Sequence, residues 1–138
     1  MQDPPSAAEL VRAVAAFLRD EALPALEGRT AYLARVSANT LEIVARELES
    51  APAADAAERA RLLALLGRDA TDRASLFELN AELCRRIEMG DIDADTPGLL
   101  AHLWSTTLAA LAVDQPGYSG YRRALDEAPP ERLLPPGP

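Results

Sequence analysis

RVSANTLEIVARELE, residues 35–49, decides the fold, because its apolar residues recur with the spacing of an amphipathic α-helix. The pattern extends over about residues 29–50, and Pro52 is expected to stop it. The apolar arc of this helix consists of Leu33, Val36, Leu41, Ile43, Val44 and Leu48. A segment of this length with one apolar side predicts a protein in which helices pack on helices.

Polar side chains share the face of these leucines and valines. At about 100° per residue, Thr40 and Glu47 fall inside the apolar arc. Asn39 and Arg46 form a parallel stripe at its edge, and Asn80 falls in the middle of an apolar arc on a later helix. A carboxylate that faces a core costs several kcal/mol without compensation. Glu47 therefore needs a hydrogen bond, an arginine, a proton or access to water.

Three interpretations of these polar residues are open. They can form a structural network that fixes the register of the helices, line a ligand pocket, or take part in catalysis. In a pocket, Arg46 would bind an anion, Glu47 would act as acid or base, and the amides of Asn39 and Asn80 would orient the ligand. The candidate ligand-binding residues are Asn39, Thr40, Arg46, Glu47 and Asn80.

The remaining helices are expected from the signals at their ends. Ser6 begins a capping box for a helix that Pro24 ends or kinks, and Ser75 begins another for a helix that ends before Gly90. Three further helical segments are expected: residues 53–66, residues 97–113 with Thr96 as N-cap, and a short turn over residues 121–126. The sequence thus predicts an antiparallel bundle of about five helices over residues 1–127, followed by an extended, proline-rich tail over residues 128–138.

Composition supports the all-α class and excludes some partners. Aromatic residues make up only 4% of the 138 residues, and alanine and leucine dominate. All fourteen basic residues are arginines, yet the net charge is −8 and no basic stripe is present, so nucleic acid is not an expected partner. No apolar run reaches the roughly 18 residues of a membrane span, and no leader is recognisable, so we expect a cytoplasmic protein.

Metal and cofactor sites are not expected. Cys84 and His102 are the only cysteine and the only histidine, which excludes an intramolecular disulfide and leaves too few nitrogen and sulfur ligands for a transition metal. His102 falls off the main apolar arc of its helix, so we expect it to be partly exposed. The aspartates of GDIDADTP, residues 90–97, lack the frame of a calcium loop and are explained by helix capping. We assign no catalytic residue.

Four segments together carry a resemblance to a known family. DPPSAAELVRAVAAFL, RVSANTLEIVARELE, LNAELCRRI and LAVDQPGY, in this order over about residues 3–121, resemble a family of small bacterial proteins that is described only as a domain of unknown function. The resemblance implies genes beside proteins similar to aminoglycoside phosphotransferases and acyl-CoA dehydrogenases. It implies an accessory role and assigns no reaction.

These observations define three hypotheses, of which the last is a dimeric scaffold without a pocket that a partner recognises through the acidic outer face. The first is a non-enzymatic accessory or binding protein that acts with a phosphotransferase-like kinase or an acyl-CoA dehydrogenase. The alternative is a small-molecule or catalytic pocket between the helices of residues 29–50 and 76–89. A homodimer is expected in each case, because Trp104, Leu108 and Leu111 widen the apolar arc of their helix beyond what one seam of a small bundle needs.

Overall fold

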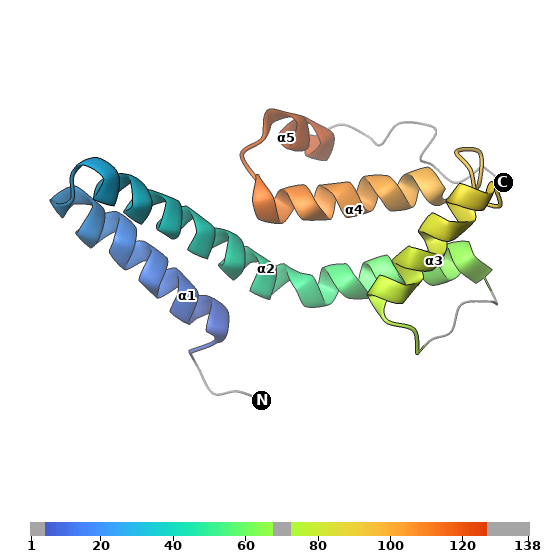
Figure 1. The fold of residues 1–138 in the computed structure, drawn as a ribbon, viewed down its shortest axis with the longest axis horizontal. Helices are drawn as coiled ribbons and strands as arrows, with labels where there is room; N and C mark the ends of the chain where they lie inside the picture. Colours follow the sequence, from blue (N-terminus) through green and yellow to red (C-terminus); the bar gives the residue numbers. More distant parts are fainter. Residues whose placement is uncertain (1–4, 68–72, 127–138) are drawn as a thin grey trace. The chain divides into compact units, whose positions relative to one another are not determined.

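The computed structural model describes residues 5–67 and 73–126. Within these ranges the chain contains five α-helices and no strand, which confirms the all-α class (Figure 1). The chain divides into two compact units, Met1–Pro52 and Ala53–Pro138, and each is described by itself. A single domain over residues 1–127 stays a prediction, and the proline-rich tail over residues 128–138 lies outside the described residues. None of the described helices is long and apolar enough to cross a membrane.

The first unit begins with helix α1 (Ala7–Ala16). The predicted capping box is confirmed, because the Ser6 amide donates to Glu9 Oε2 at 2.7 Å and the Glu9 amide donates to Ser6 Oγ at 3.3 Å. A π-helical segment, η1 (Phe17–Ala22), and a 3-10 turn, η2 (Leu23–Ala25), follow. Pro24 lies in that turn, so the chain leaves the first helix where the sequence predicts.

Helix α2 (Gly28–Leu66) is a single helix of 39 residues that contains Pro52. The expectation that Pro52 separates two helices is therefore wrong. Proline removes one backbone hydrogen bond, to the carbonyl of Leu48, but the residues around it are mostly alanine, which has the highest helix propensity. The strong local preference for helix outweighs the missing bond.

Helices α1 and α2 form an antiparallel hairpin in the first unit (Figure 1). The contact between them is made of alanines at heptad spacing: Ala8 and Ala15 from α1, and Ala38 and Ala45 from α2, are all buried. Small side chains allow the two helix axes to approach closely. The hairpin consequently has a narrow core that contains no large buried side chain among the described residues of this unit.

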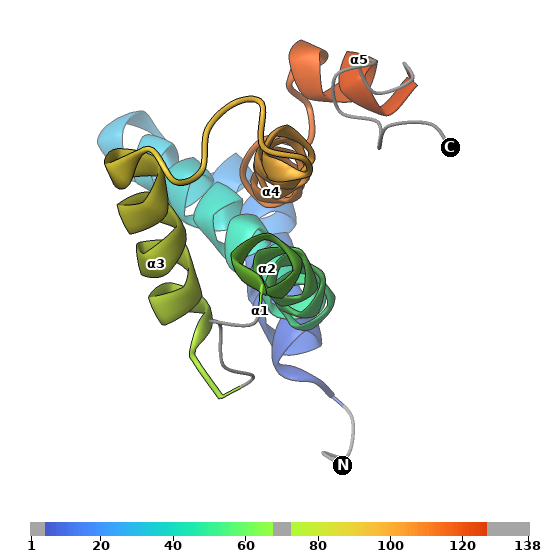
Figure 2. The same ribbon diagram turned by 90° about the vertical axis from the view of Figure 1, so that its right-hand side faces the viewer.

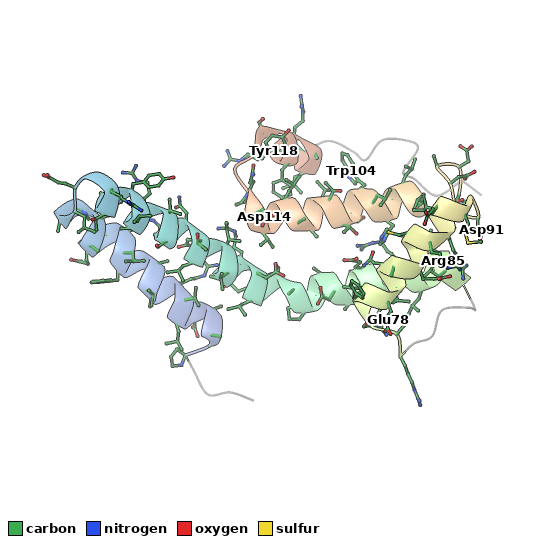
Figure 3. The ribbon with its side chains drawn as sticks, viewed as in Figure 1. Glu78, Arg85, Asp91, Trp104, Asp114 and Tyr118 are labelled. Carbon is green, nitrogen blue, oxygen red and sulfur yellow. The ribbon has the colours of Figure 1, made fainter. Side chains whose placement is uncertain are left out.

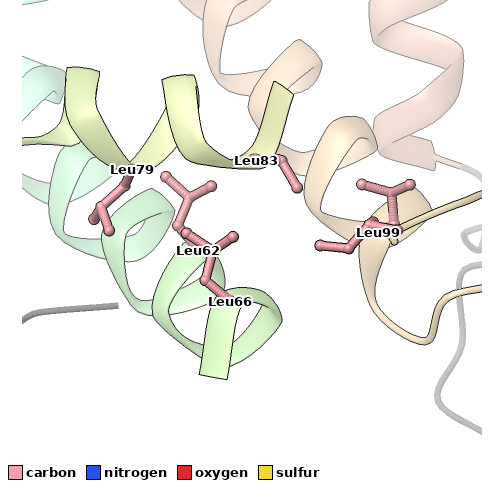
Figure 4. Close-up of a cluster of buried hydrophobic side chains, with 6 residues drawn as sticks. Leu62, Leu66, Leu79, Leu83 and Leu99 are labelled. Carbon is pink, nitrogen blue, oxygen red and sulfur yellow. The ribbon is translucent and has the colours of Figure 1, made fainter. Parts of the chain in front are cut away.

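The second unit contains the end of α2 and the helices α3 (Leu76–Met89), α4 (Leu99–Asp114) and α5 (Ser119–Asp126). The end of α2, α3 and the start of α4 enclose a compact hydrophobic cluster (Figures 2 and 4). Its buried members are Leu62, Leu66, Leu79, Leu83, Ile92 and Leu99. This cluster fixes the start of α4 against the last turns of α2 and so positions the side chains that face each other there.

Both ends of α3 follow the sequence prediction. Ser75 and Glu78 form the second capping box, with the Ser75 amide 2.7 Å from Glu78 Oε2, and Gly90 ends the helix in a left-handed conformation (φ 79°). Glu78 lies on the first turn of α3 (Figure 3). Near the end of α3, Arg86 donates from Nη1 to the carbonyl of Leu66 at 3.1 Å. An otherwise unpaired carbonyl at the end of α2 is thereby satisfied.

The start of α4 differs from the prediction. Its N-cap is Gly98, in a left-handed conformation (φ 90°) and without a side-chain cap, instead of Thr96. Thr96 Oγ1 accepts from the Asp93 amide at 3.0 Å and donates to Asp93 Oδ1 at 3.1 Å, so its hydroxyl stabilises the preceding loop. The first turn of α4 is left without a side-chain acceptor.

Candidate functional site

The candidate residues on α2 lie on a face that is open to solvent. Asn39, Thr40 and Glu47 are exposed and Arg46 is half-buried. Thr40 donates to the carbonyl of Val36 at 3.0 Å, one turn back in its own helix. Glu47 needs neither a protein hydrogen bond, an arginine nor a proton to offset burial, because its carboxylate is accessible to water.

The apolar arc around Glu47 is exposed as well. The expectation that it faces the core is wrong, because Leu33, Val36, Val44 and Leu48 all have more than 40% of their surface accessible. The helical period is correct, but the buried line of α2 runs through Ala38 and Ala45, about 130° away from the centre of the arc. Because alanine has less apolar surface than leucine or valine, a helical projection gives it little weight, and the line through Ala38 and Ala45 is not recognised as the packed side.

Asn80 belongs to the second unit, where it is half-buried on α3. Its Nδ2 donates to Glu58 Oε1 at 2.7 Å and to the carbonyl of Leu76 at 3.2 Å. These bonds are the structural network that a buried amide requires. A pocket that joins Asn80 to the polar residues of the first unit stays a prediction.

The α1–α2 hairpin is amphipathic across both of its helices. Projected from their common contact, Val14 of α1 and Leu33, Val44 and Leu48 of α2 fall on one side of the hairpin, whereas Leu10, Phe17 and Val36 point mainly away from the partner helix. We call these seven exposed side chains together the hairpin apolar face. Phe17 has 58% of its surface accessible, whereas Ala15 and Ala45 of the hairpin core have none. The largest apolar groups of the unit thus lie outside its own core.

The opposite side of the hairpin carries ion pairs. Arg12 binds Glu49 through two hydrogen bonds, of 3.0 and 2.7 Å, and also reaches Glu42 at 3.2 Å. Arg19 contacts the other oxygen of Glu42 at 3.2 Å. The guanidinium of Arg12 lowers the pKa of Glu49, chiefly by hydrogen bonding. These ion pairs hold α1 against α2, and they identify this side of the hairpin as its polar, solvent-facing side.

Two charged residues, Arg29 and Glu47, lie near the two ends of the exposed apolar stripe of α2, which consists of Leu33, Val36, Val44 and Leu48. Arg29 and Glu47 are eighteen residues apart, which is five helical turns, so they lie on the same line along the helix, about 27 Å from each other. Both are exposed, and within the described residues neither makes an ion pair. Arg29 also lies in the first turn of α2, where the helix dipole disfavours a cation.

A cavity of about 200 Å³ lies within the second unit, between the end of α2 and the start of α4. It is lined by Arg61, Ala64, Leu65, Pro97, Gly98, Ala101 and His102. His102 has only 2% of its surface accessible, so the expectation that it is partly exposed is wrong. Helix α4 is apolar around most of its circumference, and its sequence does not reveal which side meets α2.

Two residues that line this cavity each have a side-chain nitrogen that is buried away from solvent and has no hydrogen-bond partner, namely Arg61 Nε and His102 Nδ1. The Arg61 side chain reaches across to α4, where its Nη2 donates to Thr106 Oγ1 at 3.4 Å. Burial lowers the pKa of His102, the charge of Arg61 lowers it further, and Glu58 acts in the opposite direction. The imidazole is consequently neutral at pH 7.

Over residues 5–67 and 73–126 the chain is all-α, with an exposed apolar face on the hairpin of its first unit and a small, partly polar cavity in its second. The chain belongs to the family described as Domain of unknown function (DUF6285), whose model matches residues 24–118. This match confirms the resemblance at the level of the family, and it includes α2, α3 and α4 in full. Comparison with curated proteins and with solved structures finds no match.

Proposed function

We propose that this protein is a non-enzymatic binding protein of the bacterial cytoplasm that acts as a homodimer, joined through the hairpin apolar face. The exposure of that face carries the proposal. Seven large apolar side chains of this two-helix unit are exposed. Exposed groups of large apolar side chains are typical of protein–protein interaction sites.

The energetics of the hairpin support an additional layer on this face. A buried methyl group of alanine contributes about 0.8 kcal/mol, whereas a fully buried valine, leucine or phenylalanine side chain contributes about 1.5 to 3 kcal/mol. Among the described residues of the first unit, the four buried side chains are alanines, whereas the seven side chains of the hairpin apolar face are exposed. The hydrophobic stabilisation that these seven can supply is therefore fully realised only when another surface covers them.

A second copy of the chain satisfies both the shape and the charges of this face. Two such hairpins stacked face to face make a four-helix bundle. When two α2 stripes pack antiparallel about a two-fold axis near Ala38, residue 29 of one copy meets residue 47 of the other. Arg29 then pairs with Glu47 at both ends of the apolar contact. In this arrangement Glu47 gains an ion-pair partner, and the ion pairs set the register of the two helices in the dimer.

Substitution of the apolar face tests the homodimer. Leu33→Gln combined with Val44→Gln removes two apolar groups per copy, so the dissociation constant from sedimentation equilibrium should rise at least about a hundredfold. Leu125→Gln on α5, which changes an exposed leucine of the second unit, is the matched control and should leave it unchanged. A wild-type chain that sediments as a monomer at high micromolar concentration would contradict the proposal.

We infer the partner of this dimer from the resemblance alone. The accessory role extends to a phosphotransferase-like kinase or an acyl-CoA dehydrogenase encoded nearby, and the acidic outer surface of the dimer, with a net charge of −8 per chain, would bind it. Co-purification of the tagged chain from its native host should enrich one of the two enzymes. Enrichment of neither would contradict this part of the proposal while leaving the homodimer intact.

A further inference from the structure

Helix α4 is attached to the rest of the second unit by few buried side chains. Of its 16 residues, only Leu99, His102 and Val113 are buried. Leu99 belongs to the hydrophobic cluster at the end of α2, and Gly98 lets the helix begin close to α2, since a Cβ there would lie 3.4 Å from Leu65 Cδ2. His102 follows Leu99 by about one helical turn. The imidazole is therefore one of the main points at which α4 is held.

This imidazole is packed in its uncharged form. His102 has only 2% of its surface accessible, and its Nδ1 is buried without a hydrogen-bond partner. In the protonated ring both nitrogens are donors. Proton uptake would therefore place a positive charge and an unpaired Nδ1–H group in a site closed to solvent. It is unfavourable for as long as α4 stays in place.

The facing side of α2 adds a second obstacle to proton uptake. Arg61 crosses to α4, where its Nη2 donates to Thr106 Oγ1 at 3.4 Å, one turn beyond His102. Its fixed positive charge opposes a charge on the imidazole, whereas the carboxylate of Glu58 favours one. That carboxylate already accepts from Asn80 Nδ2 of α3 at 2.7 Å. Burial and Arg61 prevail over Glu58, because the pKa of His102 is lowered overall.

The other charged groups around the start of α4 are engaged elsewhere or exposed. Arg86 of α3 is paired with Glu82 at 2.8 Å. On α4 itself the only other ionisable side chain is Asp114, twelve residues beyond His102 and so about 18 Å along the helix. The loop before α4 carries three exposed aspartates, Asp91, Asp93 and Asp95. The charge balance at the imidazole is therefore set by the two side chains of α2.

Release of α4 would remove the penalty for proton uptake. An imidazole that leaves the contact regains water, and its pKa returns to the ordinary value of 6.5. Because the pKa of His102 is lower while α4 is packed, the packed arrangement is stabilised fully above pH 6.5. This stabilisation is lost progressively as the pH falls below that value.

We propose that the contact between α4 and the end of α2 is a proton-sensitive latch, in which proton uptake by His102 releases α4. Helices α2 and α3 stay packed, because their buried leucines contact one another without α4. Mild acidification thus exposes the apolar sides of α4 and of the end of α2. The buried members that α2 and α3 contribute are Leu62, Leu66, Leu79 and Leu83. The latch lies wholly in the second unit and does not depend on the homodimer proposed for the first.

Amide hydrogen exchange of the full chain between pH 7.0 and 5.5 tests the latch. His102 is the only histidine, so no other side chain of the chain has an ordinary pKa in this interval. After correction for the intrinsic exchange rate, the opening equilibrium constant of the α4 amides should rise at least about threefold from pH 7.0 to 5.5. The amides of α3 should change much less. An equal rise in α3 would indicate global unfolding and would overturn the proposal, as would no rise in α4.

Variants of the histidine test whether the proton acts at this site. His102→Leu should abolish the rise in α4, and His102→Gln makes the same test with an uncharged polar side chain if the leucine variant does not fold. Arg35→Gln, which removes a charge from an exposed position of α2, is the control and should retain the full rise. A rise that persists without the histidine would overturn the proposal.

Variants of the two α2 side chains test the charge balance. Arg61→Gln removes the opposing charge and should raise the pKa of His102, whereas Glu58→Gln removes the favourable charge and should lower it. The imidazole proton resonances of the single histidine measure both shifts. If the two variants move this pKa in the same direction, or leave it unchanged, the imidazole does not lie in the contact that the latch requires.

Discussion

At the scale of the residue, exposure decides what each polar group does. Glu47 and Asn80 share the same signal in the sequence, a polar group inside an apolar arc, yet Asn80 is half-buried with two hydrogen bonds and Glu47 is exposed. The helical period places a side chain on a face but does not say what covers the face. The hydroxyl of Thr107, on α4, donates to the carbonyl of Leu103 at 2.8 Å, one turn back in its own helix, so this polar group needs no partner outside the helix.

His102 was missed for a related reason. The buried line of α4 runs through Leu99, His102 and Val113, whereas none of its other four leucines is buried. Because α4 is apolar on nearly every side, its sequence does not identify the packed side, and no pattern singles out His102. His102, which lines the cavity, was therefore assigned to the exposed side of α4 by the helical projection.

Glu82 provides a prediction about pH. Hydrogen bonds from Arg85 and Arg86 lower the pKa of Glu82 from 4.5 to about 2. Because the folded-state pKa is depressed, the pairing stabilises the fold above pH 4.5, and this contribution is lost as the pH falls towards 2. The stability difference between the wild-type protein and Glu82→Gln, measured by urea unfolding, should be constant at neutral pH and shrink over that interval. A difference that grows on acidification would contradict the assignment.

At the scale of the element, helix ends were predictable and helix continuity was not. The two serine capping boxes and the stop at Gly90 are local signals, and all three are confirmed. Continuity through Pro52 depends on a balance between one lost hydrogen bond and the summed propensity of its neighbours, which no single motif expresses. Gly98 displaces Thr96 as N-cap because the Thr96 hydroxyl is engaged with Asp93.

Pro52→Ala tests the account of α2. Alanine restores the amide that can bond to the carbonyl of Leu48, so the free energy of unfolding should rise by about 1 to 3 kcal/mol. Pro24→Ala is the matched control, because Pro24 lies in the first turn of η2, where proline is tolerated, and should change stability much less. Chemical denaturation followed by circular dichroism measures both, and a destabilised Pro52→Ala variant would show that the proline serves another purpose.

Ser75→Ala tests the start of α3. Loss of the hydroxyl that accepts from the Glu78 amide should cost about 1 kcal/mol. Ser75→Asp retains an acceptor at the N-cap and should remain close to the wild-type stability in the same denaturation experiment. If both variants lose stability equally, the contribution of Ser75 is not that of a helix cap.

At the scale of the whole molecule, the class of fold could be predicted from the sequence, but the location of the exposed apolar surface could not. The expected surplus lay around Trp104, Leu108 and Leu111, and these three are half-buried. Seven exposed large apolar side chains lie instead in the first unit, in the hairpin apolar face. A projection of one helix cannot show that α1 and α2 meet through alanines, because that depends on which of two possible sides the partner helix takes.

The proposed homodimer makes a specific prediction about charge. In the two-fold arrangement, Arg29→Glu places two glutamates against each other at both ends of the interface, and Glu47→Arg does the same with arginines. Each variant alone should therefore dimerise at least about tenfold more weakly than the wild-type chain. Arg35→Glu, which reverses a charge on a different side of α2, should dimerise normally.

Mixing the Arg29→Glu and Glu47→Arg variants tests the central claim most directly. In a mixed dimer the glutamate introduced at position 29 of one copy meets the arginine introduced at position 47 of the other. At the opposite end the native Glu47 of the first copy meets the native Arg29 of the second, so both ends are again complementary. Sedimentation velocity of the equimolar mixture should show a heterodimer of wild-type stability, although each variant alone is mainly monomeric. A mixture as monomeric as its components, or two variants that dimerise like the wild type, would contradict the pairing of Arg29 with Glu47 across a two-fold axis.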